Sequence, residues 1–528
     1  MRMKYHVTIP LMAATLVLVV LSLFCVNEKS KVDQMFQLNN QRIAEGYYMA
    51  EFEFKMVGIL YELDKGNFVQ SLRLLRELQN QLITGDGLIK TPLFENKAQE
   101  LAFYKDRQNA ETGAFMDDSY PLCTYFQPTM NVLEHIANLS KQVGQPVELN
   151  HPLHFLEAID APHELQNYLD DLSTVGRLVA KMPKTPNVLS TLGSHKELEH
   201  LQLFTFSEEW KKELIRWHWH NQDPETGYWG VRIRGQQGLI NGGDLTNTAR
   251  IIKLFADKDG RDLHAEFPLR YKSKMIETTL AKLTTPVPGD LTGQHEWSID
   301  RSRCVRLLTD YLWHDLSSGQ KKSARKGFEK LLNDVFTRFY IPQKGAFSLY
   351  ADQMSASLDG TAEYFSLMRR LGFFSKERKQ KIWGDSKTAL LQMDQSPSPD
   401  ALISFIKSCC LEYPINSVRL YAGSAPGSPD LADTRAVIYP TPPTVLDSVD
   451  ILSHLNRWLE NTNQNIGNWV SKGSLLKRLS QERLQPVPVF HGYPDSTTIR
   501  KILEQNASLT VVGVDTRQKP VVRFSISK

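Results

Sequence analysis

Apolar residues recur at intervals of three and four between residues 37 and 371, which is the spacing of one buried face of an α-helix. Strand patterning is weak throughout this region. Helices are predicted over residues 37–63, 67–82, 95–106, 122–137, 160–181, 207–220, 245–255, 271–283, 300–315, 319–339 and 360–371. The pattern therefore predicts a mainly α body built from helical hairpins.

The N-terminus has a different pattern. Arg2 and Lys4 precede an uncharged run over residues 7–25, and such a run would span about 28 Å as a helix, enough to cross a bilayer core. Its end lacks the small residues of a cleavage site, and Phe24 stands where a lipoprotein signal has a small residue. We expect residues 1–6 in the cytoplasm, an uncleaved transmembrane signal anchor at 7–25, and a periplasmic or extracellular body. A cleaved signal peptide is the alternative.

The composition changes after residue 413. Pro, Gly and Ser cluster at 423–429 and 439–443, residues 445–459 have helical spacing, and residues 508–514 and 520–526 alternate as strands do. The domains expected are a helical one over 32–412 and a small α/β accessory domain over 413–528.

A motif recurs within the helical body. Its first copy is FYKDRQNAETGAF at 103–115, its second is WHWHNQDPETGYW at 217–229, and a weaker third is FYIPQKGAF at 339–347. Each copy has leading aromatic residues, a Gln, and a Gly followed two residues later by an aromatic. Gly113 and Gly227 lie 114 residues apart. Repetition at this spacing predicts a repeat architecture.

The motif resembles the QW motif of triterpene cyclases and related turns of protein prenyltransferases. In those families it ties together the hairpins of an α/α toroid: Gln bonds across a hairpin end, Gly permits a tight turn and the aromatic packs on the next hairpin. The matching residues are Gln108, Gly113, Phe115, Gln222, Gly227 and Trp229. The resemblance implies an α/α toroid of about six hairpins, a scaffold also found in polysaccharide lyases and glycoside hydrolases.

The catalytic signatures of the first two families are missing. Triterpene cyclases protonate with Asp-x-Asp-Asp, and no such run occurs in this chain, where Asp117-Asp118 is only a pair. Prenyltransferases hold zinc with Asp, Cys and His, and no corresponding cluster occurs here. The five cysteines form no Cys-x-x-Cys pair, and His218 and His220 would point to different faces of a helix. We expect neither a metal nor a cofactor.

Composition narrows the classes of function. The 528 residues are 41% hydrophobic and 23% charged, as in globular proteins, and are too many for one ordinary core. Net charge is +3, from 62 basic and 59 acidic residues, so no electrostatic footprint for nucleic acid is present.

The loops after the motifs hold the candidate chemistry, because equivalent turns of a toroid face the same way. Candidate catalytic residues are Asp117, Asp118, Asp244 and Glu363. Candidate substrate-binding residues are Tyr120, Arg232, Arg234, His295, Trp297 and Tyr350. A glycosidase needs two carboxylates about 5–10 Å apart, and a lyase needs a group that neutralises a uronate and a base. The alternative is that Asp244 and Asp359 only cap helices and that the arginines lie in a solvated loop.

The sequence therefore predicts a membrane-anchored, extracytoplasmic hydrolase or lyase that acts on a polysaccharide or glycoconjugate by general acid/base chemistry. Part of this prediction is analogy of fold, which does not establish function. A terpenoid-cyclase-like or prenyltransferase-like enzyme is one alternative, and it predicts a deep apolar cavity. A non-catalytic envelope protein that binds a glycan or a protein is the other, and it predicts rim acids too far apart to cooperate.

Overall fold

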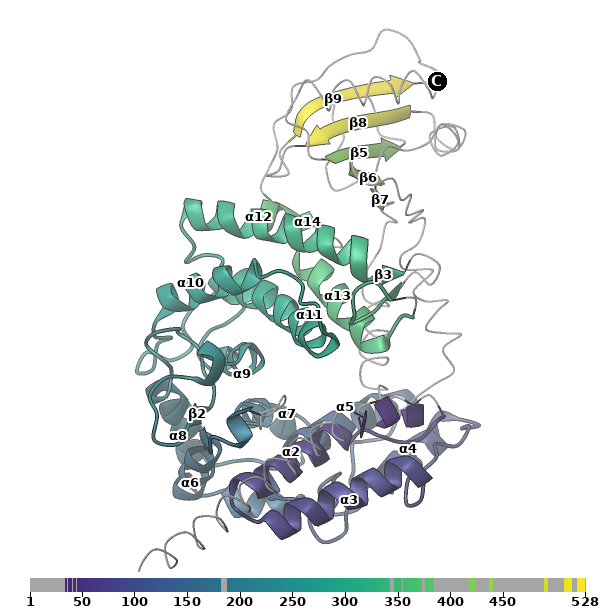
Figure 1. Ribbon diagram of the computed structural model, residues 1–528, viewed down its shortest axis with the longest axis vertical. Coiled ribbons are helices and arrows are strands. Elements are labelled where there is room, and N and C mark those ends of the chain that lie inside the picture. Colours follow the sequence, from purple (N-terminus) through teal and green to yellow (C-terminus); the bar gives the residue numbers. More distant parts are fainter. Residues whose placement is uncertain are drawn as a thin grey trace, which may run out of the picture. The chain divides into compact units, whose positions relative to one another are not determined.

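The computed structural model describes residues 34–383 except 36, 40, 44, 182–187, 342–345, 354 and 373–375, together with the backbone of five strands between residues 417 and 527. The chain divides into two compact units. Unit 1 holds the described residues up to Trp210 and the segment Val231–Gln237, and unit 2 holds Lys211–Gly230 and the described residues from Gly238 onward. Both units are mainly helical, which confirms the predicted α class (Figure 1).

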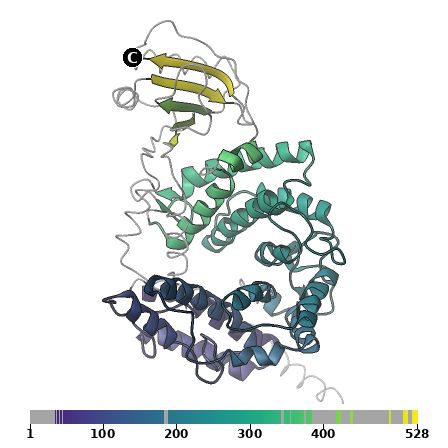
Figure 2. The ribbon, with the colours of Figure 1, turned by 180° about the vertical axis from the view of Figure 1, so that it is seen from behind.

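Unit 1 is built from paired helices. Its α-helices are α2 (Phe52–Asp64), α3 (Phe68–Thr84), α4 (Lys97–Lys105), α5 (Phe126–Val143), α6 (Pro162–Leu172) and α7 (His195–His200). Helix α2 packs along α3, and α4 packs along α5 (Figures 1 and 2). The buried stripe of α3 includes Leu75, Leu78 and Leu82, the residues that the helical spacing predicts. Helix α8 (Glu208–His220) continues from unit 1 into unit 2.

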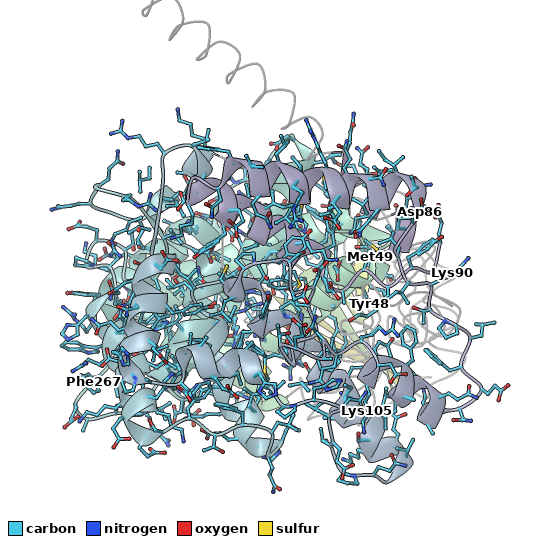
Figure 3. The ribbon with its side chains drawn as sticks, turned by 90° about the horizontal axis from the view of Figure 1, so that it is seen from below. Tyr48, Met49, Asp86, Lys90, Lys105 and Phe267 are labelled. Atoms are coloured by element: carbon cyan, nitrogen blue, oxygen red, sulfur yellow. The ribbon has the colours of Figure 1, made fainter. Side chains whose placement is uncertain are left out.

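Two predicted helices of unit 1 are shorter than expected. The single helix predicted over 37–63 is interrupted because Tyr47 forms a β-bridge with Lys90 and the N–H of Tyr48 donates to the carbonyl of Ile89 at 2.7 Å. Figure 3 shows Tyr48 and Met49 near Lys90. The helix predicted over 160–181 ends at Leu172, and the chain then forms strand β1 (Thr174–Val175), which pairs in parallel with β2 (Arg232–Ile233).

Unit 2 is centred on one long helix. Its α-helices are α9 (Leu245–Ile251), α10 (Lys272–Leu283), α11 (Leu291–Arg306), α12 (Ser318–Asp334), α13 (Leu358–Arg370) and α14 (Lys376–Trp383). Helix α11 packs against α9, α10 and α13. Two π-helical turns, η7 (Leu307–Leu312) and η8 (Val335–Phe339), extend α11 and α12. Short 3₁₀ turns occur in both units. Those of unit 1 are η1 (Leu122–Thr124), η2 (His154–Ile159), η3 (Val179–Lys181) and η4 (Thr191–Ser194), and those of unit 2 are η5 (Ile240–Gly242) and η6 (Ile252–Leu254).

Two helix starts in unit 2 differ from the predictions. Helix α11 begins at Leu291 and not at Asp300, because the side chain of Asp290 caps it by accepting a hydrogen bond from the N–H of Gly293. His295 and Trp297 therefore lie in a helix and not in a loop. The cap of α13 is Ser357, so Asp359 lies in the first turn and is not the N-cap. Asp244 caps α9 as predicted, with the N–H of Asn247 donating to it at 2.6 Å.

The described strands of unit 2 form two sheets. Strands β3 (Tyr340–Ile341) and β4 (Ala346–Phe347) make a short antiparallel pair. The larger sheet has the order β7-β6-β5-β8-β9, visible at one end of Figure 1. Its strands are β5 (Ser417–Ala422), β6 (Ala436–Tyr439), β7 (Val489–His491), β8 (Ser508–Val514) and β9 (Pro520–Ser527). The two strands predicted in the C-terminal region are confirmed as the antiparallel pair β8 and β9.

Two expectations fall outside the described residues: the anchor at 7–25 and the helix at 445–459. Within residues 34–383, gaps aside, and the five C-terminal strands, no helix has the length and apolar character needed to span a bilayer.

Candidate functional site

The glutamine of the first motif copy connects the motif's own turn to a later segment of unit 1. The side-chain nitrogen of Gln108 donates to the carbonyl of Gly113 at 2.8 Å and to the carbonyl of His151 at 2.7 Å. Its side-chain oxygen accepts a hydrogen bond from the N–H of His151 at 2.9 Å. One amide side chain thus satisfies three backbone groups, which we call the glutamine clamp.

The second copy forms the same clamp in unit 2. Gln222 donates to the carbonyls of Gly227 and Arg270, both at 2.8 Å, and accepts from the N–H of Arg270 at 3.1 Å. Because only Tyr271 lies between Arg270 and α10, the clamp joins the motif turn to the start of that helix. The role of the glutamine predicted from the motif, bonding across a hairpin end, is confirmed in both described copies.

The motif glycines allow the later segment to approach closely. Gly113 has a φ of +71°, and a β-carbon there would lie 1.7 Å from the carbonyl oxygen of Pro152. Gly227 has a φ of +73°, and a β-carbon there would lie 2.5 Å from the backbone nitrogen of Met275. Both the backbone conformation and the space exclude any larger residue.

All three motif copies share a hydrogen bond to a threonine side chain. The aromatic residue two positions after the motif glycine donates its N–H to a threonine hydroxyl of the next helix. The pairs are Phe115 with Thr129 at 3.0 Å, Trp229 with Thr248 at 3.1 Å, and Phe347 with Thr361 at 3.0 Å. Gln343 and Gly345 of the third copy lie outside the described residues. The motif therefore holds the helices together, and its chemistry is structural.

The predicted site residues of unit 1 mainly shape a loop. Asp117 lies 3.8 Å from the ammonium of Lys55, and Asp118 is exposed and accepts a hydrogen bond from the side chain of Asn109 at 3.2 Å. Tyr120 is only 6% exposed, with the Lys55 ammonium 5.6 Å from its ring centre. Burial raises the pKa of Tyr120 far above its ordinary value. A buried phenol of this kind is a packing group.

The two arginines predicted to bind substrate lie on or beside strand β2 of unit 1. The guanidinium of Arg234 donates to Asp64 at 2.9 Å, and Asp64 also accepts the N–H of Gly176. Arg232 is half-buried within the strand. The Arg234–Asp64 pair therefore ties the β1–β2 pair to the end of α2.

A polar cluster in unit 2 gathers around α11. We call Asp244, Lys282, Glu296, Asp300 and Arg301 the α11 cluster. Glu296, Asp300 and Arg301 lie on α11, while Asp244 caps α9 and Lys282 lies in the last turn of α10. Glu296 is exposed, Asp300 is half-buried and Arg301 is 3% exposed, so the cluster runs from the surface into the core.

Asp300 is the unusual member of the α11 cluster. The pKa of its carboxyl is raised to about 6, chiefly by burial and in part by the negative charges of Asp244 and Glu296, while the positive charges of Lys282 and Arg301 oppose the rise. No hydrogen bond joins this carboxyl to another described residue. A carboxyl that titrates near neutrality in a partly open position is suited to proton transfer.

Asp300 was missed because the helix was expected to begin there. Once α11 is known to start at Leu291, Glu296 and Asp300 are four residues apart and share one face. That spacing is the sequence feature that could have identified the cluster.

Two predicted substrate-binding residues, His295 and Tyr350, lie near each other. Their ring centres are 6.2 Å apart and the planes differ by 28°. Tyr350 is half-buried, and its pKa is raised by burial and by the charge of Asp359. His295 also lies 3.8 Å from the carboxylate of its neighbour Glu296, which connects the ring pair to the α11 cluster.

Trp297 belongs to the hydrophobic core. It is 4% exposed, stacks on Phe339 with ring centres 5.3 Å apart, and donates its indole N–H to the carbonyl of Thr285 at 2.9 Å. With its ring packed and its polar atom bonded, Trp297 is not placed to stack on a substrate, contrary to the prediction.

Glu363 forms an ion pair within unit 2. Both of its oxygens accept hydrogen bonds from Arg303, each at 3.1 Å. Burial acts to raise its pKa, but the charges of Arg303 and Arg370 and the hydrogen bonds from Arg303 outweigh this effect and lower it. A carboxylate held in its ionised form by two donors has no proton to give, so Glu363 is not suited to the role of general acid.

The two cysteines within the described residues, Cys123 and Cys304, are buried. Burial raises the pKa of Cys304 to about 12, and Cys123 is also buried, so both thiols stay protonated. His218 is buried and His220 is exposed, which confirms that they face different ways. Among the residues that the structure describes, no group of three or more His, Cys, Asp or Glu side chains is arranged to hold a metal.

Comparison with known proteins does not add to this geometry. No protein-family model matches the chain, and no curated protein and no solved structure is detectably similar to it. The interpretation of the α11 cluster therefore rests on its own residues.

Proposed function

We propose that unit 2 carries an enzyme site that cleaves a polysaccharide or glycoconjugate, with Asp300 as the proton donor and Asp244 as its carboxylate partner. The observation that carries this proposal is the state of Asp300. Its carboxyl is half-buried, has a pKa raised to about 6, and makes no hydrogen bond to another described residue. Few structural roles account for such a group, whereas a general acid requires it.

The chemistry of the pair follows from the different surroundings of the two carboxyls. Asp300 would pass its proton to the glycosidic oxygen as the bond to the leaving sugar breaks. Asp244 accepts a backbone hydrogen bond at the start of α9 and carries one of the negative charges that act on Asp300. It would activate water, or attack the sugar carbon itself. In a lyase the carboxylate of Asp244 would instead remove a proton from the sugar ring.

The half-buried ring of Tyr350 and the neighbouring ring of His295 support a carbohydrate substrate. Aromatic faces and polar ring edges provide the mixed apolar and hydrogen-bonding surface that sugars bind. His295 lies one residue before Glu296, at the exposed end of the α11 cluster. A sugar lying against this ring pair would therefore be close to the proposed acid.

We also propose that the helical hairpins form an α/α toroid and that residues 7–25 anchor the chain in a membrane. Two identical glutamine clamps and three identical threonine contacts support the toroid, since a ring of repeated hairpins needs the same joint at each repeat. The uncharged run after Arg2 and Lys4 supports the anchor and an extracytoplasmic body.

The test is cleavage by the purified chain of neutral, amino-sugar and uronate-containing polysaccharides. Reducing-end release reports hydrolysis, and absorbance of unsaturated uronate reports elimination. Asp300→Asn should lower the rate by about 100-fold or more, since it removes the proton donor. Asp244→Asn should have an effect of similar size.

The matched control is Asp259→Asn, which removes an exposed carboxylate of the same unit and should leave the rate unchanged. Wild-type rates in both Asp300→Asn and Asp244→Asn would exclude the mechanism. Glycan binding without cleavage of any polymer would instead favour the non-catalytic alternative.

A further inference from the structure

Arg301 is a buried arginine for which the described residues provide no hydrogen-bond acceptor at two of its side-chain nitrogens. It is 3% exposed, and its guanidinium carbon lies 5.6 Å from the ring centre of Trp297. Its Nε and Nη1 atoms are buried and have no hydrogen-bond partner. Among the described residues, no carboxylate forms an ion pair with it.

Two other arginines of unit 2, the buried Arg370 and the half-buried Arg303, are paired with carboxylates. Arg370, at 9% exposure, donates to Asp310 at 3.1 Å, and Arg303 donates twice to Glu363. A buried charge without a hydrogen-bonded counterpart is strongly unfavourable, which is why such groups are normally paired. Arg301 therefore differs from Arg370 and Arg303 in a way that points to a partner outside the protein.

The position of Arg301 connects it to the proposed acid. Arg301 directly follows Asp300 on α11, and its positive charge lowers the pKa of Asp300 and also acts on Tyr228 and Cys304. Glu296, Asp300 and Arg301 follow one another along α11 with decreasing exposure. Arg301 thus forms the inner end of the α11 cluster, with Lys282 as a second cation.

We infer that Arg301 is the subsite for a carboxylate of the substrate, so that the polymer cleaved at Asp300 contains acidic sugar residues. This inference rests on the proposed function. A guanidinium presents two planar edges, one containing Nε and one containing Nη1, and each matches a carboxylate in a two-bond arrangement. A uronic acid carries such a carboxylate on its ring, within one sugar unit of the bond to be cleaved.

Charge balance permits such a ligand. With Asp300 protonated, the cluster holds two carboxylates, Asp244 and Glu296, and two cations, Lys282 and Arg301. An incoming carboxylate therefore meets a neutral site and finds an unpaired guanidinium at its inner end. A neutral sugar would leave the guanidinium of Arg301 without a negatively charged partner.

The experiment measures binding of sodium D-glucuronate and of D-glucose to the full chain by calorimetry, which does not depend on catalysis. Glucuronate should bind at least about tenfold more tightly than glucose, and Arg301→Met should remove that difference. Arg301→Lys, which keeps the charge and loses the planar edges, should bind with intermediate affinity. Arg261→Met removes an exposed arginine of the same unit and should bind as wild type does.

Equal binding of the two sugars by the wild-type chain would overturn the inference, and so would full glucuronate preference in Arg301→Met. The wild-type comparison needs no variant, so it decides even if Arg301→Met fails to fold. Asp300→Asn separates this inference from the proposed function. This variant should keep the preference for glucuronate and lose cleavage. If it keeps both, Asp300 is not the proton donor and the proposed function is wrong, while the inference about Arg301 stands.

Discussion

The side chain of Gln222 bonds both the carbonyl and the N–H of Arg270, a residue 48 positions later along the chain. Gln108 bonds His151 in the same way, 43 positions later. Two separate parts of the sequence thus each form a clamp with the same pattern of three hydrogen bonds. Because each clamp precedes the start of a further helical segment, it fixes the direction in which that segment leaves.

Replacing Gln222 with Leu should destabilise unit 2. The substitution leaves the carbonyls of Gly227 and Arg270 and one N–H without a partner, at a cost of about 3 kcal/mol in the free energy of unfolding. Urea unfolding followed by tryptophan fluorescence measures the change. Gln237→Leu alters an exposed glutamine and serves as the control. Equal unfolding midpoints for the two variants would show that the clamp contributes nothing to stability.

Gly113→Ala tests the close approach at the first clamp. The new methyl group would collide with the carbonyl of Pro152, so we expect a loss of more than about 3 kcal/mol. Gly66→Ala is the matched control, because Gly66 also has a positive φ, +81°, but nothing lies within 4 Å of its added β-carbon. That variant should lose only about 1 kcal/mol, the cost of the backbone conformation. A similar loss in both variants would mean that conformation, and not contact, selects the glycine.

Thr248→Val tests the joint that all three motif copies share. Valine keeps the shape of threonine but leaves the buried N–H of Trp229 without an acceptor, which should cost about 1–3 kcal/mol. Thr248→Ser restores the hydroxyl and should recover most of this loss. Amide hydrogen exchange at Trp229 is the direct measurement, and faster exchange is expected in the valine variant alone.

The motif geometry could be predicted from the sequence because it depends on residues close together in the chain. Gln222, Gly227 and Trp229 lie within eight residues, and their roles follow from an amide side chain, a flexible backbone and a large apolar ring. The threonine that accepts the aromatic N–H was not predicted, since it lies 14 or 19 residues further on at a spacing that varies.

Long-range pairing explains the helices that were predicted wrongly. The break near Tyr47 depends on its bridge to Lys90, which no local pattern reveals. The early start of α11 was hidden because Gly293, Gln294 and His295 interrupt the apolar spacing, although the cap at Asp290 is a local feature.

The candidate site was predicted only in part. Adjacent acids such as Asp117-Asp118 are candidates from the sequence because two neighbouring carboxylates are visible there. The raised pKa of Asp300 depends on how deeply α11 is packed against its neighbours, and burial of that kind arises from tertiary structure. Asp244 could be identified because a helix cap has a local sequence pattern.

Glu363→Gln should destabilise the protein rather than change proton transfer. Breaking the pair leaves Arg303, whose side chain is 20% exposed, without its carboxylate, and we expect a loss of about 2–3 kcal/mol at neutral pH. The folded pKa of Glu363 lies below its unfolded value, so this stabilisation is present above the unfolded pKa and is lost as the pH falls. The difference between wild type and variant should therefore shrink in acid, as unfolding measured across pH will show. A stable variant with an altered pH profile of activity would contradict this assignment and return Glu363 to the list of catalytic residues.

Asp300→Asn should stabilise the protein at alkaline pH. The folded pKa of Asp300 is about 6, above its ordinary value of 3.8, so the folded state holds this proton more tightly than the unfolded state does. Below both pKa values the carboxyl is neutral in both states and carries no penalty. As the pH rises from the unfolded pKa to above the folded pKa, the wild-type protein must ionise a partly buried carboxyl, and its stability falls.

Asparagine does not ionise, so the variant avoids that penalty. Its stability relative to wild type should rise by about 2 kcal/mol between about pH 4 and about pH 8, since one unit of pKa shift corresponds to about 1.4 kcal/mol and partial exposure reduces the full effect. Unfolding at a series of pH values measures this, with Asp259→Asn as the exposed control. A constant difference across the range would show that Asp300 is not a perturbed carboxyl. The proposed acid would then have to be sought elsewhere in the α11 cluster, with Glu296 as the remaining carboxyl on the same helix face.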